Sequence, residues 1–213
     1  MRIYHLPAKI QALAFDMDLT LYTNPEYGQY QTDSLVEKLR HREGLSFAEM
    51  SRKIDEDRKA WALSHGGKKP SLSNILESYG ISMEENIRWR KEAYEPERFI
   101  KEDPRLRETL KKLSFFYTLG VVTNVPIVVA RKTFLALGVE EIFPIVVGLD
   151  TCMTAKPHKI PFLKFSELAG CPPEACVSIG DRYDVDLDIP LEIGMGGILV
   201  DGVEDVYKLP EVL

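Results

Sequence analysis

The chain has 213 residues, of which 45% are hydrophobic and 28% charged, and its 27 basic and 33 acidic residues leave a net charge of -6. This composition describes an ordinary soluble protein with room for one α/β core and a smaller second unit, and it excludes the disordered and fibrous classes. The absence of a basic block argues against a nucleic-acid polymer as partner, and the absence of a long apolar run argues against a signal peptide or a membrane span, so we expect a cytoplasmic protein.

The first informative pattern in chain order is the stretch 12–22. An apolar run of strand length ends in Asp16 and Asp18, and Thr20 follows. Residues two apart in an extended chain face the same side, so both carboxylates are placed to act on one substrate at the end of a sheet. Two close carboxylates repel each other unless a cation, a shared proton or a division of roles relieves the repulsion. The alternative is an acidic turn without a function.

Residues 31–100 have a different character. A serine followed three residues later by a glutamate, the spacing of a helix capping box, occurs at Ser34, Ser46 and Ser82. These helix starts, without a convincing strand pattern between them, predict an all-helical insert. The expected division of the chain is a helical cap at 22–100 and a core made of 1–21 and 101–213.

A glycine-rich, positively charged loop with Lys68 and Lys69 lies between the second and third of these expected helix starts. The simplest interpretation is a solvated loop. The alternative is a loop that closes over an anionic substrate.

Beyond residue 100 the chain alternates between helix and strand patterns. Helices are expected to begin at Pro104, after the capping Asp103, and again at Pro126 and Lys159. The expected strands lie at 117–124, 145–148, 175–180 and 197–200. Continuously apolar strands that alternate with helices predict an α/β fold with a doubly wound, Rossmann-like parallel sheet that is covered on both faces.

Polar side chains stand where these strands end. Asp16, Thr123 and Asp181 each follow a strand, and Lys156 lies in a loop from which it can reach the same edge. Ligands of open α/β folds bind at this edge, and a carboxylate cluster there needs a cation. Hard oxygen ligands favour magnesium over zinc or copper. Acids, a hydroxyl, an ammonium and a divalent ion are typical of a phosphoryl-transfer site.

The cysteines and histidines offer no competing site. Three cysteines in a chain without a secretory signal argue against a disulfide framework. Cys171 and Cys176 lack a second pair that would complete a zinc site, and the histidines have no metal-ligand spacing.

Four blocks follow one another along the chain: Asp16-Met17-Asp18-Leu19-Thr20, Thr123-Asn124, Lys156-Pro157, and Gly180-Asp181 with the acids after it. In this order they resemble the haloacid dehalogenase-like (HAD) superfamily, and specifically its phosphatases with a helical cap inserted after the first strand. Residues 15–22 are similar to the start of nucleotidases and phosphoglycolate phosphatases. Asp184, Asp186 and Asp188 compete for the role of the downstream acid, and the spacing to residues 194–195 favours Asp186.

The resemblance implies a mechanism. Asp16 is expected to attack phosphorus and form an aspartyl-phosphate, and Asp18 to protonate the leaving oxygen and then deprotonate the attacking water. Mg2+ is expected to be held by Asp16, the backbone carbonyl of Asp18, and Asp181. Asp186 is expected to support the metal site by holding these ligands in place, without binding the ion directly.

Three further residues are expected to bind the phosphoryl group. Thr123 and the backbone amide of Asn124 contact its oxygens. Lys156 keeps Asp16 ionised and stabilises the transferred charge.

These expectations describe a magnesium-dependent phosphatase of a small phosphomonoester, of nucleotide, sugar phosphate or phosphoglycolate type. A phosphomutase with the same aspartyl-phosphate chemistry and a non-catalytic HAD-like binding protein are the alternatives. Dehalogenases of the same superfamily need neither an acid at the position of Asp18 nor a metal, so Asp18 and Asp181 argue against that activity.

Overall fold

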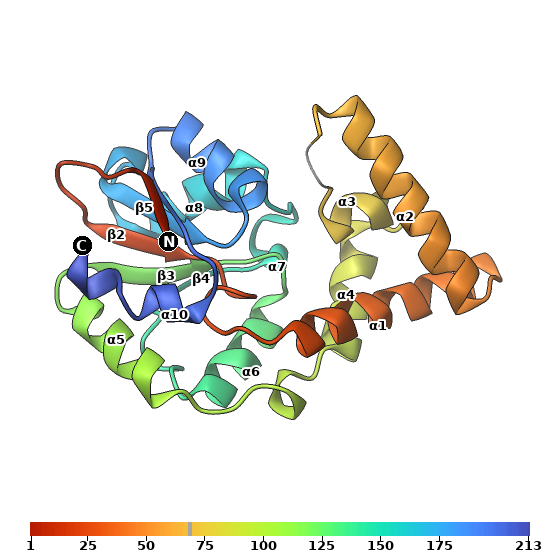
Figure 1. The fold of residues 1–213 in the computed structure, drawn as a ribbon, viewed down its shortest axis with the longest axis horizontal. Helices are drawn as coiled ribbons and strands as arrows, with labels where there is room; N and C mark the ends of the chain where they lie inside the picture. Colours follow the sequence, from red (N-terminus) through yellow and green to blue (C-terminus); the bar gives the residue numbers. More distant parts are fainter. Residues whose placement is uncertain (68–69) are drawn as a thin grey trace.

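The computed structural model of the chain describes residues 1–67 and 70–213. The interpretation of Lys68 and Lys69 as a substrate-gripping loop lies outside these residues and stays a prediction. The described residues form an α/β core and, beside it, a group of helices labelled α1 to α4 (Figure 1). This arrangement confirms the predicted fold class, an α/β core with an inserted helical cap.

Within the described ranges the core sheet has six strands, in the order β1-β6-β5-β2-β3-β4. The strands are β1 (Arg2–His5), β2 (Ala12–Phe15), β3 (Thr118–Val122), β4 (Ile145–Val147), β5 (Cys176–Gly180) and β6 (Gly196–Leu199). The central strand β2 pairs in parallel with β3 and β5, so that Phe15 lies between Val121 and Ile179. This register brings the carboxyl ends of the three strands to one place.

Strand β1 departs from the predicted parallel sheet, because it pairs antiparallel with β6 at the edge. Its residues, Arg2–His5, are mostly exposed and contain no apolar run. An edge strand with open faces needs no such run, which is why the sequence pattern misses it. The other strand pairs of the described sheet are parallel, as predicted.

Helices cover both faces of the sheet (Figure 1). On one face lie α8 (Lys159–Ala169) and α9 (Asp188–Glu192), and on the other α5 (Pro104–Ser114), α6 (Ile127–Leu137) and α10 (Val203–Val206). The short helix α7 (Leu149–Cys152) follows β4, and single helical turns occupy Pro96–Arg98, Pro173–Ala175, Tyr183–Leu187 and Leu209–Glu211.

The two faces of β2 pack differently. Leu13 belongs to the large apolar cluster on the side of α5 and α6. Ala12 and Ala14 face the other way and join the cluster that contains Phe162 and Phe165 of α8. Small side chains on this face leave room for the two rings, and the strand is buried on both sides.

Local signals set the ends of the core helices. The side chain of Asp103 accepts a hydrogen bond from the backbone N–H of Leu106 at 2.8 Å and starts α5. Gly138 and Gly170 follow α6 and α8 in the left-handed conformation, with φ of 72° and 68°. These ends lie where the sequence predicts them.

The cap consists of α1 (Pro25–Glu43), α2 (Phe47–Ser64), α3 (Leu72–Ser78) and α4 (Met83–Ala93). Ser46 and Ser82 cap α2 and α4, as predicted. The prediction for Ser34 is wrong, because this residue lies inside α1 and its hydroxyl donates to the carbonyl oxygen of Tyr30 at 2.7 Å.

The starts of two cap helices differ from the predicted pattern. Helix α1 begins after Asn24, whose side chain accepts from the N–H of Tyr27 at 3.0 Å. Helix α3 is capped by Ser71, with Asn74 in the place of the glutamate. The serine–glutamate pattern therefore does not predict this helix start. None of the helices in the described residues has the length and apolar character of a membrane span.

Candidate active site

Asp16 is the first residue after β2, in the middle of the sheet. Its backbone N–H donates to the carbonyl oxygen of Ile179 in β5 at 2.7 Å, so the ladder of hydrogen bonds continues up to this residue. The side chain is 12% exposed. Because β2 is packed on both faces, the carboxylate of Asp16 has a fixed place at the carboxyl edge of the sheet.

Lys156 lies in the loop between α7 and α8, and its side chain is 2% exposed. The ammonium donates to Oδ1 of Asp16 at 2.5 Å and to Oδ1 of Asp186 at 2.7 Å. Burial opposes the charge, but the two carboxylates outweigh burial and raise the pKa of Lys156 above its ordinary value. Lys156 is therefore positively charged and bridges two acids.

The side chain of Asn124 holds the backbone of Lys156. The N–H of Lys156 donates to Oδ1 of Asn124 at 2.7 Å, and Nδ2 of Asn124 donates to the carbonyl oxygen of Lys156 at 3.1 Å. The sequence motif predicts a role for the backbone amide of Asn124 but not this role of its side chain.

Thr123 is buried at the end of β3, next to Asn124. Its hydroxyl accepts from the N–H of Val125 at 3.4 Å. Both Thr123 and Asn124 stand beside the end of β2, since β3 is its parallel neighbour.

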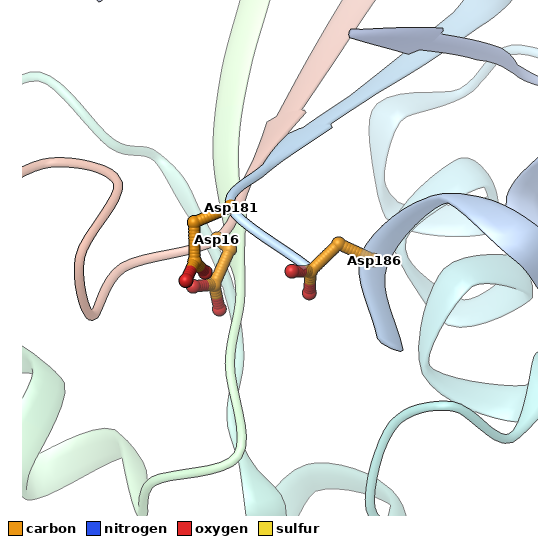
Figure 2. A group of neighbouring side chains, drawn as sticks. All are labelled: Asp16, Asp181 and Asp186. Atoms are coloured by element: carbon orange, nitrogen blue, oxygen red, sulfur yellow. The ribbon is translucent and has the colours of Figure 1, made fainter. Parts of the chain in front are cut away.

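Asp16, Asp181 and Asp186 contribute carboxylate oxygens that all lie within 4.8 Å of one another (Figure 2). Asp181 follows β5, and Asp186 belongs to the helical turn after it. Burial and then the charge of Asp16 raise the pKa of Asp181 to about 7. Burial also raises the pKa of Asp186 to about 6, although Lys156 opposes the rise. The pKa of Asp16 is raised by burial too, again against the effect of Lys156.

This acidic cluster suits a hard divalent cation. The cluster has three carboxylates and one ammonium, which pairs with Asp16 and Asp186, so ionisation of all three carboxylates leaves an excess of negative charge. A cation among their oxygens would offset the burial and the repulsion that raise the pKa values. Carboxylate oxygens are the ligands that Mg2+ prefers in proteins. The donor set is of the kind that the predicted magnesium needs.

Asp186, and not Asp184, belongs to the cluster, because close packing and hydrogen bonds hold it there. Gly180 makes room, because a Cβ there would collide with the carboxyl group of Asp186. The hydroxyl of Ser178 donates to the backbone carbonyl of Asp186 at 2.7 Å, and the N–H of Arg182 donates to its Oδ2 at 3.1 Å. Asp184 instead accepts from the guanidinium of Arg182 at 2.8 Å.

Asp18 receives two hydrogen bonds that the sequence analysis misses. The hydroxyl of Tyr22 and, at 3.1 Å, Nε2 of Gln31 both donate to Oδ1 of Asp18. Leu19 has a φ of 59°, a left-handed turn that folds the chain so that Tyr22 returns to Asp18. The spacing of four residues is a local signal for Tyr22. Gln31 belongs to the cap helix α1, and no local pattern links it to Asp18.

Comparison with known proteins gives the family. The family model of the haloacid dehalogenase-like hydrolases matches residues 13–200. The chain therefore belongs to the haloacid dehalogenase-like hydrolases, as the order of the four blocks indicates.

Phosphatases are among the relatives and solved structures that are similar to the chain. A phosphoglycolate phosphatase from Xylella fastidiosa is 39% identical over 62 residues, which cover 29% of this chain and only 27% of that protein. A glyceraldehyde 3-phosphate phosphatase from Methanopyrus kandleri is 26% identical over 185 residues, which cover 84% of this chain and 78% of that protein. The crystal structure of a HAD phosphatase from Thermococcus onnurineus superimposes with a TM-score of 0.62 at 20% identity, covering 95% of this chain and 97% of that one, and so shares the fold.

Proposed function

We propose that this protein is a magnesium-dependent phosphatase that hydrolyses a small phosphomonoester through an aspartyl-phosphate on Asp16. The observation that carries the proposal is the 2.5 Å contact of Asp16 with the buried ammonium of Lys156, beside the carboxylates of Asp181 and Asp186. The ammonium favours an ionised Asp16 against the effect of burial, as a nucleophile requires. Relatives named phosphoglycolate phosphatase and glyceraldehyde 3-phosphate phosphatase support a phosphomonoester substrate.

Hydrolysis proceeds in two displacements at phosphorus. A carboxylate oxygen of Asp16 attacks, the bond to the leaving oxygen breaks, and Asp18 supplies the proton that this oxygen takes up. Asp18 then removes a proton from a water molecule, whose oxygen attacks the same phosphorus and releases Asp16 and inorganic phosphate. The hydrogen bonds from Tyr22 and Gln31 orient the carboxyl group of Asp18 for both transfers.

The neighbouring strand end and loop bind the phosphoryl oxygens. In this proposal the hydroxyl of Thr123 and the backbone N–H of Asn124 donate to them, and Lys156 stabilises the charge that is transferred. The two hydrogen bonds between the side chain of Asn124 and the backbone of Lys156 keep these groups together.

Magnesium would be held by Asp16, the backbone carbonyl of Asp18, and Asp181. When bound, it supplies positive charge that reduces the repulsion between the nucleophile and the phosphate. Asp186 keeps Lys156 in place, because it shares the ammonium with Asp16.

We further propose that the cap occupies 22–100 and the core 1–21 and 101–213, with the substrate enclosed between them. A cavity of about 570 Å³ opens at this boundary. Its lining includes Arg58 and Lys59 from the cap and Arg182 from the core. Asp55 also lines the cavity and pairs with Arg58 at 3.5 Å, which leaves a net positive charge on the lining. A positively charged lining raises the local concentration of an anionic phosphomonoester.

Release of inorganic phosphate tests the proposal. The substrates are p-nitrophenyl phosphate, nucleoside monophosphates, sugar phosphates and phosphoglycolate, each with Mg2+ and with excess chelator. We expect release with Mg2+, and none with chelator or in the Asp16→Asn variant. Full turnover in excess chelator would contradict the metal assignment. Formation of an isomeric phosphate without phosphate release would identify a phosphomutase, and phosphate binding without turnover would identify a binding protein.

A further inference from the structure

Arg90, in the cap helix α4, is a buried cation with an exposure of 6%. Among the described residues its guanidinium donates to neutral oxygens alone: Oδ1 of Asn86 at 2.8 Å, the hydroxyl of Tyr94 at 3.1 Å and the hydroxyl of Ser73 at 3.3 Å. In residues 1–67 and 70–213, no carboxylate forms an ion pair with Arg90.

The missing counter-ion is unusual for a buried charge. Burying a charge is costly unless an opposite charge accompanies it. Lys156, the other buried cation in the described part of the chain, is accompanied by two carboxylates. Arg88, on the same helix, is exposed and pairs with Glu85 at 3.1 Å. The surroundings of Arg90 are therefore those of a site that an external anion completes.

The unused donors of Arg90 have a specific geometry. A guanidinium has five N–H donors in one plane. The bonds to Asn86, Tyr94 and Ser73 use three, and five minus three leaves two, one on each terminal nitrogen. Two donors on the terminal nitrogens of one planar group can bind the two oxygens of a carboxylate.

Two tyrosines link Arg90 to the catalytic acid. Burial raises the pKa of Tyr94 to about 12, with Arg90 opposing the rise and the charge of Asp18 adding to it. Tyr27, on α1, is fully buried, and its hydroxyl makes no hydrogen bond to another described residue. Burial and then the charge of Asp18 raise the pKa of Tyr27 as well. Contacts show the same placement. Tyr27 packs on Tyr22, with ring centroids 6.1 Å apart, and the hydroxyl of Tyr22 donates to Asp18. Tyr94 follows Ala93, whose carbonyl oxygen accepts from the hydroxyl of Tyr30 on α1 at 3.0 Å, and the hydroxyl of Tyr94 accepts from Arg90.

We propose that Arg90 binds a carboxylate on the leaving group of the substrate, with the hydroxyls of Tyr27 and Tyr94 beside it. This inference rests on the proposed phosphatase function and narrows its substrate class to small phosphomonoesters that carry a carboxylate. The leaving group is small, because the side chains of Arg90, Tyr27 and Tyr94, which belong to the cap, are all buried. Asp18 serves the ester oxygen at one end of this group, and Arg90 holds the other end.

Two pairs of substrates test the inference, because the members of each pair differ only in a carboxylate and an aldehyde. They are phosphoglycolate with glycolaldehyde phosphate, and 3-phosphoglycerate with glyceraldehyde 3-phosphate. In the wild type we expect kcat/KM to favour at least one carboxylate by about 10²-fold, the size of effect that a buried charge pair produces. Arg90→Gln should reduce this preference to about tenfold or less. Arg90→Lys, which keeps the charge without the planar fork, should restore part of the preference.

The matched control is Arg88→Gln, which removes the same charge from the exposed side of α4 and should leave the preference unchanged. A folded Arg90→Gln variant that keeps the preference would overturn the inference. So would a wild type that hydrolyses both aldehydes as well as the carboxylates, a result that does not depend on how the variant folds. If the wild type hydrolyses no phosphomonoester at all, including p-nitrophenyl phosphate, the proposed function fails and this inference fails with it.

Discussion

Asp16 and Asp18 are two residues apart, but their side chains meet different partners. The carboxylate of Asp16 contacts the ammonium of Lys156, and that of Asp18 accepts hydrogen bonds from Tyr22 and Gln31. A fixed positive charge favours an ionised nucleophile, whereas neutral donors allow a group to exchange a proton during the reaction. The environments therefore support the division of roles that we propose.

Substituting the two aspartates separately tests this division. Asp16→Asn removes the nucleophile and should abolish the phospho-enzyme. Asp18→Asn keeps the nucleophile and loses proton transfer, which costs about 10²–10⁴-fold in rate. Because p-nitrophenolate leaves without a proton and dephosphorylation needs a base, the Asp18 variant should accumulate phospho-enzyme from p-nitrophenyl phosphate. Mass spectrometry of acid-quenched protein detects the added phosphate. An adduct on the Asp16 variant instead would show that the roles are reversed.

Gly180 is a second residue with a testable role. A methyl group at this position would collide with the carboxyl group of Asp186, so Gly180→Ala should displace Asp186 and weaken its hold on Lys156. We expect a loss of stability of about 1–3 kcal/mol, as for other overpacked sites, together with a lower kcat. Urea denaturation and phosphate release measure the two effects.

Gly28→Ala is the matched control for this substitution. A Cβ at Gly28, inside α1, has no atom within 4 Å, so the change should stabilise the helix by about 0.5–1 kcal/mol and leave kcat unchanged. If Gly180→Ala and Gly28→Ala changed stability and kcat equally, the contact between Gly180 and Asp186 would not contribute to the active site.

At the scale of the elements, Asn24 joins the two connections between cap and core. Its side chain accepts from the N–H of Tyr27 at the start of α1, and Nδ2 donates to the carbonyl oxygen of Phe99 at 2.9 Å. The first bond caps the helix, and the second links the chain that enters the cap to the chain that leaves it.

Variants that lose one or both of these hydrogen bonds should be destabilised to different degrees. Asn24→Ala loses both and should cost about 1–2 kcal/mol, more than Ser46→Ala, which removes only the cap of α2. Asn24→Asp keeps the acceptor for Tyr27 and loses the donor to Phe99, so its stability should lie between those of wild type and Asn24→Ala. Midpoints of urea unfolding give the order. An Asn24→Asp variant as stable as the wild type would show that the hydrogen bond to Phe99 does not contribute to stability.

At the scale of the whole molecule, the acidic cluster connects stability with metal and pH. Asp181 and Asp186 have pKa values of about 7 and about 6, above the ordinary value of 3.8, because they are buried near other carboxylates. A raised pKa means that the metal-free fold is favoured below the ordinary pKa, and that this contribution is lost as the pH rises through about 6 to 7. Bound Mg2+ requires the ionised carboxylates, so it should restore stability over the same range.

The stabilisation by Mg2+ should therefore be larger at pH 8 than at pH 5. At a free concentration of one hundred times its Kd, a single bound ion contributes about 2.7 kcal/mol. Thermal unfolding with and without Mg2+ at both pH values measures the difference, and Asp181→Asn should abolish most of it. A shift that is independent of pH, or that persists in the Asp181 variant, would place the ion elsewhere.

Much of this molecule is determined by residues close together in the sequence. The apolar run of β2, the capping Asp103 and the terminating Gly170 act on their own segments, so the parallel strands and most helix ends are predictable. The carboxyl ends of parallel strands lie at one edge of the sheet, so the motifs also predict that Asp16 and Asp181 are neighbours. The structure brings these two residues together. The family follows from the order of these motifs.

The tertiary structure alone decides which distant side chains meet. Gln31 reaches Asp18 from the cap, and the side chain of Asn124 holds the backbone of Lys156. Arg90 is buried without an acid among the described residues. Strand β1 is likewise set by its neighbour β6 and not by its own residues. The burial and the charge around such groups depend on packing between separate elements, and packing leaves no local pattern in the sequence.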